Sequence, residues 1–123
     1  MQRPDSMTRF PWRLAVSAAV LAFPCLLWAA TPVIEIQIRD HLFFPPEVVV
    51  PANTKVKLIV YNRDPTPEEF ESFELNREKV IMGGRKAVIF IGPLAPGEYP
   101  FFGEFNPQTA LGKIVVTDTA DAG

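Results

Sequence analysis

The sequence has very little of the two residue types from which soft metal centres and disulfides are built. Its 123 residues include one cysteine, Cys25, and one histidine, His41. A single cysteine cannot form a disulfide within the chain, so a domain built from this sequence must be stabilised by its own hydrophobic core. The sequence is rich in Val, Ile and Phe, which can supply such a core.

Residues 1–30 have the features of a secretory signal peptide. A basic stretch with three arginines precedes the apolar run 14–27, and the small residues Ala29 and Ala30 follow it as a cleavage site. The alternative is an uncleaved membrane anchor, but the run is shorter than the roughly 20 residues needed to cross a bilayer. A lipoprotein is disfavoured because Pro24 precedes Cys25. We therefore expect export to the periplasm.

Cleavage after residue 30 would change the chemistry of the chain. Cys25 is lost with the signal peptide, so the mature protein has no thiol. Nine basic residues then stand against thirteen acidic ones, a net charge of −4 with histidine neutral. This balance argues against nucleic acid as a partner and favours cations.

The pattern of the remaining chain predicts an all-β domain over residues 31–118, with a flexible tail at 119–123. Several segments alternate apolar and polar residues, and Pro, Gly and Asn clusters separate them. No window has a convincing amphipathic helical stripe. We expect a Greek-key β-sandwich or barrel of about seven strands. The clearest predicted strands are 33–39, 43–50, 55–61, 86–91, 99–105 and 113–117.

Three short motifs resemble those of a known family. They are Glu69-Phe-Glu-Ser72, Leu75-Asn-Arg-Glu-Lys79 and Phe101-Phe-Gly-Glu-Phe105. In these motifs and in the order of its strands the chain resembles cupredoxin-like proteins, specifically the periplasmic cupredoxin-like domain proteins associated with oxidase-coupled iron permeases. The resemblance implies a metal ion as ligand and contact with an inner-membrane iron permease.

Comparison with this family also shows that the expected copper ligands are replaced in this chain. In the copper-binding relatives the loop between the last two strands would carry Cys near Gly103, His near Asn106 and Met near Ala110 or Leu111. A blue-copper centre needs a cysteine thiolate and two imidazoles. The mature chain has no cysteine and one histidine, so a type 1 copper site is excluded.

Carboxylates stand where soft ligands would be expected. Five glutamates occur between positions 68 and 78, and Glu71-Ser-Phe-Glu-Leu75 matches the family pattern with Glu71 in the place of the first histidine. On a strand Glu69 and Glu71 would share a face. An oxygen-rich site suits Fe, Mn, Mg or Ca, and with one imidazole also Cu(II). The candidate ligands are His41, Glu69, Glu71, Glu78 and Glu104.

Other interpretations remain open at this stage. Acidic runs are often solvated surface, Glu78 could pair with its basic neighbours, and a lone histidine such as His41 is more often structural than a ligand. We expect first a periplasmic protein that binds Fe(II), or copper, for an iron permease. The alternatives are a metal-free interaction module and a small ferroxidase. The sequence assigns no catalytic residues, and it leaves open whether two copies pair.

Overall fold

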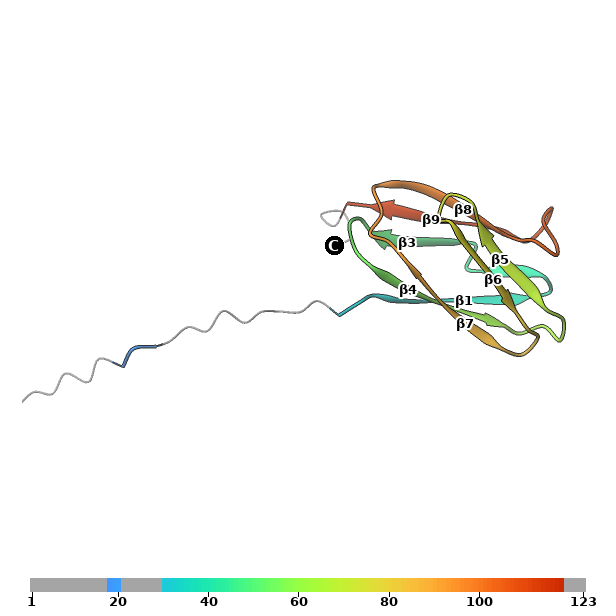
Figure 1. Ribbon diagram of the computed structural model, residues 1–123, viewed down its shortest axis with the longest axis horizontal. Coiled ribbons are helices and arrows are strands. Elements are labelled where there is room, and N and C mark those ends of the chain that lie inside the picture. The colour runs from blue at the N-terminus through green and yellow to red at the C-terminus, as the bar shows by residue number, and fades with distance from the viewer. Residues whose placement is uncertain (1–17, 21–29, 119–123) are drawn as a thin grey trace, which may run out of the picture.

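The computed structural model describes residues 18–20 and 30–118 (Figure 1). Most of the predicted signal peptide and the whole predicted tail lie outside these residues. No helix among the described residues is long and apolar enough to cross a membrane. The described chain forms nine strands: β1 Val33–Arg39, β2 Leu42–Phe44, β3 Glu47–Pro51, β4 Val56–Asn62, β5 Glu68–Ser72, β6 Arg77–Ile81, β7 Lys86–Ile91, β8 Gly97–Gly103 and β9 Leu111–Thr117.

The strands form two sheets that face each other as a sandwich (Figure 1). One sheet has four strands in the order β2-β1-β4-β7, and the other has five in the order β3-β9-β8-β5-β6. The pairs β1/β4 and β3/β9 are parallel, and the other pairs are antiparallel. The predicted all-β sandwich is therefore confirmed, with nine strands where about seven were expected.

The alternating sequence patterns account for the burial of the strands. Along β4 every second side chain from Val56 to Asn62 is buried, and β7 alternates in the same way. A strand directs successive side chains to opposite faces, so one face of each sheet contributes to the core while the other stays accessible.

The predicted strand 43–50 is divided in the structure. Phe44 ends β2, which pairs with β1 in the four-stranded sheet, and Glu47 begins β3, which pairs with β9 in the other sheet. The chain changes sheets at Pro45 and Pro46. Because proline has no N–H to donate to a ladder, two consecutive prolines cannot continue a paired strand.

The acidic strand β5 and its partner β6 were not delimited from the sequence. Four of the five residues of β5 are buried, including Glu68, Glu69 and Ser72. Such a strand has no apolar/polar alternation to recognise. The turn before it is held by Asn62, whose side-chain amide donates to the carbonyls of Thr66 (2.7 Å) and Ile81 (3.0 Å).

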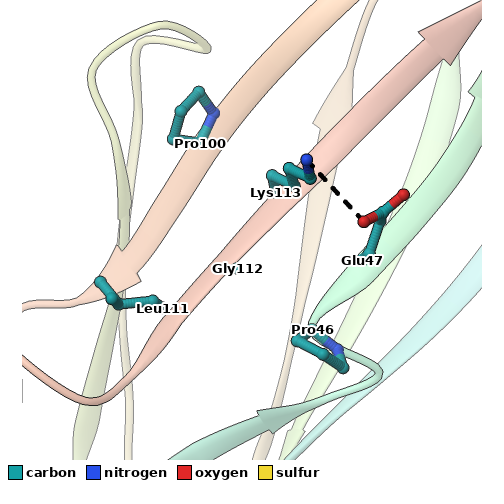
Figure 2. Close-up of a pocket in the computed structure, with 6 residues that line it drawn as sticks. All are labelled: Pro46, Glu47, Pro100, Leu111, Gly112 and Lys113. Atoms are coloured by element: carbon teal, nitrogen blue, oxygen red, sulfur yellow. Dashed lines mark ion pairs between the residues drawn. The ribbon is translucent and has the colours of Figure 1, made fainter.

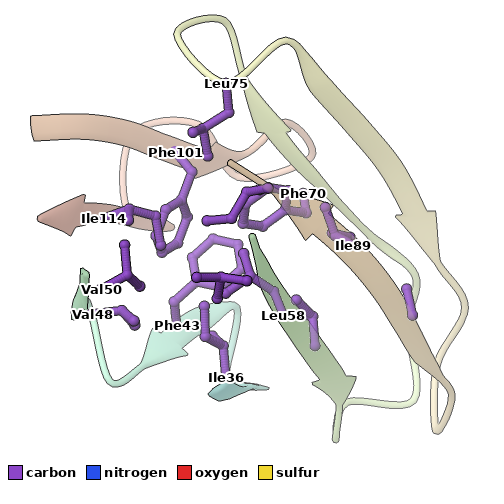
Figure 3. Close-up of a cluster of buried hydrophobic side chains, with 14 of the residues drawn as sticks. Ile36, Phe43, Val48, Val50, Leu58, Phe70, Leu75, Ile89, Phe101 and Ile114 are labelled. Carbon is purple, nitrogen blue, oxygen red and sulfur yellow. The ribbon is translucent and has the colours of Figure 1, made fainter. Parts of the chain in front are cut away.

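Three phenylalanines occupy the centre of the core (Figure 3). Phe43 meets Phe70 and Phe101 edge-on, with ring centroids 6.1 and 4.9 Å apart, and Phe70 stacks on Phe101 at 4.9 Å. Aliphatic side chains from both sheets surround them, among them Ile36, Leu58, Ile89 and Ile114. Phe70 and Phe101 come from β5 and β8, so this packing fixes the two strands that carry the acidic residues.

Candidate metal site

Three of the predicted ligands come together on the outer face of the five-stranded sheet. Glu69 and Glu71 project from β5, and Glu104 follows the end of β8 directly. One carboxylate oxygen from each of the three lies within 4.8 Å of the other two. The backbone N–H of Glu104 donates to the carbonyl of Glu69 at 2.9 Å, which aligns the two segments. We call Glu69, Glu71 and Glu104 the carboxylate cluster.

Glu78 lies beside the carboxylate cluster but is not one of its three converging residues. It is on β6, directly opposite Glu71 in the ladder between β5 and β6. Opposed residues of an antiparallel pair have neighbouring side chains on the same face. Its charge contributes to raising the pKa of both Glu69 and Glu71. It could therefore supply a fourth oxygen to a bound cation.

Two carboxyl groups of the cluster have raised pKa values. A hydrogen bond with Glu104 raises the pKa of Glu71 to about 7, with help from burial and from the charges of Glu104, Glu78 and Glu69. Burial first, then Glu104, raises the pKa of Glu69. Carboxylates this close cannot all be charged without a large repulsion. A divalent cation would remove that repulsion and take the place of the shared protons.

No basic side chain neutralises the cluster among the described residues. The ion pairs of the described residues lie outside the cluster. They join Lys113 to Glu98 at 3.0 Å and to Glu47 at 3.9 Å, and His41 to Asp64. Glu69 is only 7% exposed, and burial is the largest cause of its raised pKa. A buried carboxylate without a counter-charge favours a proton or a cation in its place.

Two hollows lie along the five-stranded sheet. The first, about 330 Å³ and lined mainly by apolar side chains, contains the Lys113–Glu47 pair but no carboxylate cluster (Figure 2). The second, about 250 Å³, adjoins the cluster, and Glu71 and Glu78 are among its lining residues. Of these two hollows, the second is therefore the one that borders the cluster.

The structure does not bring His41 into the carboxylate cluster. His41 lies in the turn between β1 and β2, and both it and Asp40 have positive φ. The backbone N–H groups of Asp40 and His41 donate to the carboxylate of Asp64 at 2.8 and 2.9 Å, and His41 Nδ1 lies 3.7 Å from Asp64 Oδ2. These contacts stabilise a tight turn that asparagine or glycine would adopt more readily.

Glu68 is the functional candidate that sequence reasoning missed. Its side chain is 1% exposed and points to the interior, opposite to Glu69 and Glu71. One oxygen accepts from the backbone N–H groups of Glu69 and Phe105, both at 3.0 Å, and the other accepts from Asn106 Nδ2 at 2.7 Å. The sequence match places Glu71 at the first histidine of the copper proteins, but it is Glu68 whose side chain contacts Phe105 and Asn106 in the loop after β8.

Comparison with known proteins identifies the family. The model of the Cupredoxin-like domain family matches residues 12–116, and the chain belongs to this family. An uncharacterized protein of Rickettsia prowazekii (strain Madrid E) is 48% identical over 85 residues, which are 69% of this chain and 68% of that protein.

Solved structures share the fold at low sequence identity. The metal-binding domain of the Cu(I)-exporting P-type ATPase CopA of Streptococcus pneumoniae D39, solved with Cu(I), matches with a TM-score of 0.63 at 17% identity, over 70% of this chain and 85% of that one. Amicyanin from Paracoccus versutus matches with a TM-score of 0.56 at 17% identity, over 72% and 85%. These likenesses show the cupredoxin-like fold.

The residues of this chain do not fit the copper centre that the fold implies. The positions expected for its ligands, Gly103, Asn106 and Ala110, do lie together, since Gly103 N–H donates to Ala110 at 2.8 Å and Ala110 N–H to Asn106 at 2.9 Å. None of them supplies a thiolate or an imidazole. A Cβ atom at Gly103 would lie 2.7 Å from Cδ of Glu68 and 2.8 Å from Cβ of Ala110, so a cysteine side chain cannot fit beside Glu68.

Proposed function

We propose that this protein is a periplasmic carrier of a divalent cation, Fe(II) in particular, which it presents to an inner-membrane iron permease. The cation would bind to Glu69, Glu71 and Glu104, with Glu78 beside them. The observation that carries the proposal is the convergence of three carboxylate oxygens within 4.8 Å on one face of the sandwich.

The chemistry of the ligand set favours hard or borderline cations. Carboxylate oxygens suit Fe(II), Mn(II), Mg(II) and Ca(II), whereas Cu(I) prefers thiolate and thioether ligands. A site of carboxylates on an outer face also leaves coordination positions for water. Such a site would release its cation readily, which suits delivery better than storage.

Two exposed phenylalanines lie close in the chain to residues of the cluster and could contact a partner. Phe73, just after β5, is 73% exposed and packs on Phe102 with ring centroids 5.5 Å apart, and Phe105 is 50% exposed. Exposed apolar patches beside charged groups are common at protein interfaces. The same observation favours the second candidate function, a metal-free interaction module of the same transport system.

Charge-removing substitutions in the cluster test the cation site. Fe(II) under anaerobic conditions, or Mn(II), should raise the melting temperature of residues 31–123 in a concentration-dependent way, because the cation binds only the folded state. Glu71→Gln and Glu104→Gln should each weaken binding at least about 10-fold, the effect usual for losing even an outer-shell partner. The metal-free variants should be equally or more stable because repulsion is relieved. Calorimetric titration and thermal melts give both quantities.

The matched control is Glu98→Gln, a glutamate on the same sheet that pairs with Lys113 outside the cluster. It should leave cation affinity unchanged. Cu(II), if it binds, should give no intense blue thiolate absorption, since no cysteine follows residue 30. Melting temperatures that stay constant at millimolar Fe(II), Mn(II) and Cu(II) would contradict the metal site and leave the interaction module as the proposal.

The role in transport is tested by iron uptake in cells. A tagged full-length protein should appear in the periplasmic fraction, and Glu71→Gln should lower the uptake of radioactive iron. Phe73→Ala should also lower uptake while the purified variant keeps its cation affinity, because the change adds no charge and Phe73, an exposed side chain, is not a ligand. Lys57→Glu on the outer face of the opposite sheet serves as a control for a surface charge change. Equal uptake by all variants would argue against the transport role.

A further inference from the structure

The carboxylate of Glu68 is buried, and its neighbours among the described residues are hydrogen-bond donors and not cations. Its three donors are two backbone N–H groups and the amide of Asn106. Leaving a carboxylate inside a domain is costly unless hydrogen bonds compensate for the lost water. The three hydrogen bonds supply this compensation for Glu68.

The donors of Glu68 belong to the segments that carry the carboxylate cluster. One is the N–H of Glu69, itself a cluster residue, and another is the N–H of Phe105, the residue after Glu104. A single carboxylate group therefore ties β5 to the loop that follows β8. The bond from Glu104 N–H to the Glu69 carbonyl is a second tie between the same segments.

The other backbone hydrogen bonds of this loop, among the described residues, are local. Within it, Asn106 N–H donates to Gly103 at 3.0 Å and Ala110 N–H donates to Asn106 at 2.9 Å. These bonds shape the loop but do not attach it to β5. Gly103 permits the close approach of Glu68, since any side chain there would collide with the carboxylate.

We propose that Glu68, together with Asn106, is a positioning residue that holds Glu104 opposite Glu69 and Glu71 so that the three oxygens converge. This inference rests on the proposed cation site. It also explains the misfit with copper. The interior position at which the copper ligands would meet is filled by a hydrogen-bonded carboxylate, and the cation-binding oxygens lie on the outer face of the same strand.

Substitutions at both partners test this role. Glu68→Ala removes the acceptor of the Phe105 N–H, and it should weaken Fe(II) or Mn(II) binding about 10- to 100-fold, as the loss of an outer-shell partner usually does. Glu68→Gln should largely restore affinity, because the amide oxygen still accepts from Glu69 and Phe105 and the side chain of Asn106 can turn to accept from the new amide. Asn106→Ala should have a smaller effect in the direction of Glu68→Ala, and it keeps the test available if Glu68→Ala does not fold.

Two measurements separate positioning from general stability. Amide hydrogen exchange by NMR on the metal-free protein should quicken at Phe105 in Glu68→Ala and stay unchanged at Val60 and Ile89 in the other sheet. Val60 is a buried residue of that sheet. Val60→Ala should lower the melting temperature, but it should not change the cation affinity measured well below that temperature.

The outcomes distinguish this inference from the proposed function. Unchanged exchange at Phe105 in Glu68→Ala, or cation affinity equal to wild type in both Glu68→Ala and Asn106→Ala, would overturn the positioning role. An equal loss of affinity in Val60→Ala would do the same, since it would reflect stability alone. A wild-type protein that binds no cation contradicts the proposed function, whereas the exchange measurement still tests whether Glu68 holds the loop.

Discussion

Cation affinity is expected to fall about 100-fold between pH 8 and pH 5, because protons and the cation compete for the same oxygens. The pKa of Glu71 is raised to about 7, so this side chain is ionised at pH 8 and protonated at pH 5. Below its pKa each pH unit lowers affinity by roughly tenfold for one competing proton. The raised pKa of Glu69 adds to the effect at the acid end. Calorimetric titration with Mn(II), which does not oxidise readily, measures this dependence.

The stability of the metal-free protein should change with pH in the opposite sense. The pKa of Glu71 is higher in the folded protein, about 7, than its usual value of 4.5. The folded state therefore binds the proton more tightly than the unfolded state, and this contribution to stability is fully present below about pH 4.5. It is lost as the pH rises through about 7. Chemical unfolding at a series of pH values should show this fall.

Glu71→Gln isolates the contribution of Glu71 to the pH dependence of cation affinity and to the pH dependence of metal-free stability. A glutamine cannot titrate, so the fall in metal-free stability between pH 4.5 and 7 should flatten, and the weakened cation binding should depend less on pH. Glu98→Gln should keep the wild-type profiles. Cation affinity that is constant from pH 5 to pH 8 in the wild type would show that the clustered carboxylates are not the ligands.

Phe70→Ala should destabilise the domain by about 3–5 kcal/mol, the usual cost of removing a buried aromatic ring. Phe70 is fully buried and contacts both Phe43 and Phe101. No disulfide can compensate, because the chain has one cysteine. For a domain of this size the melting temperature should fall by more than about 10 °C. Thermal melts of residues 31–123 measure the change.

Phe73→Ala is the matched control, because the same residue type lies three positions further along the chain and is 73% exposed. Its effect on the free energy of unfolding should stay within about 0.5 kcal/mol, as is usual for surface positions. Similar losses in the two variants would mean that the aromatic cluster of Phe43, Phe70 and Phe101 does not form the centre of the core.

Regular alternation of apolar and polar residues predicts most of the strands. The period of two in 33–39 and 55–61 indicates half-buried strands, and β1 and β4 are found there. The same rule fails at β5, because Glu68, Phe70 and Ser72 face inward without an apolar pattern. It also fails at Pro45 and Pro46, because the predicted strand that contains them is split between the two sheets. Local pattern predicts a strand but does not say which partner it pairs with.

The candidate site, like the fold, could be predicted only in part from the sequence. Composition alone argues against a blue-copper centre, since a chain with one histidine cannot supply the two imidazoles that such a centre needs. The pairing of Glu69 and Glu71 on one face also followed from the strand period, and both belong to the cluster. Only the tertiary structure decided that Glu104 joins them while His41 lies in a separate turn with Asp64. Residues this far apart in sequence are brought together by strand pairing.

Glu68 shows most clearly what could not be predicted from the sequence. Glu68 is the same residue type as its acidic neighbours in the chain, so nothing in the local sequence distinguishes a buried carboxylate from an exposed one. The register between β5 and β8 sets Phe70 opposite Gly103, and this places Glu68 beside the N–H of Phe105 and the amide of Asn106. The sequence by itself determined the fold class and the chemistry of the available ligands. Which carboxylates face outward together, and which one holds the loop from inside, depends on long-range pairing that only the folded chain supplies.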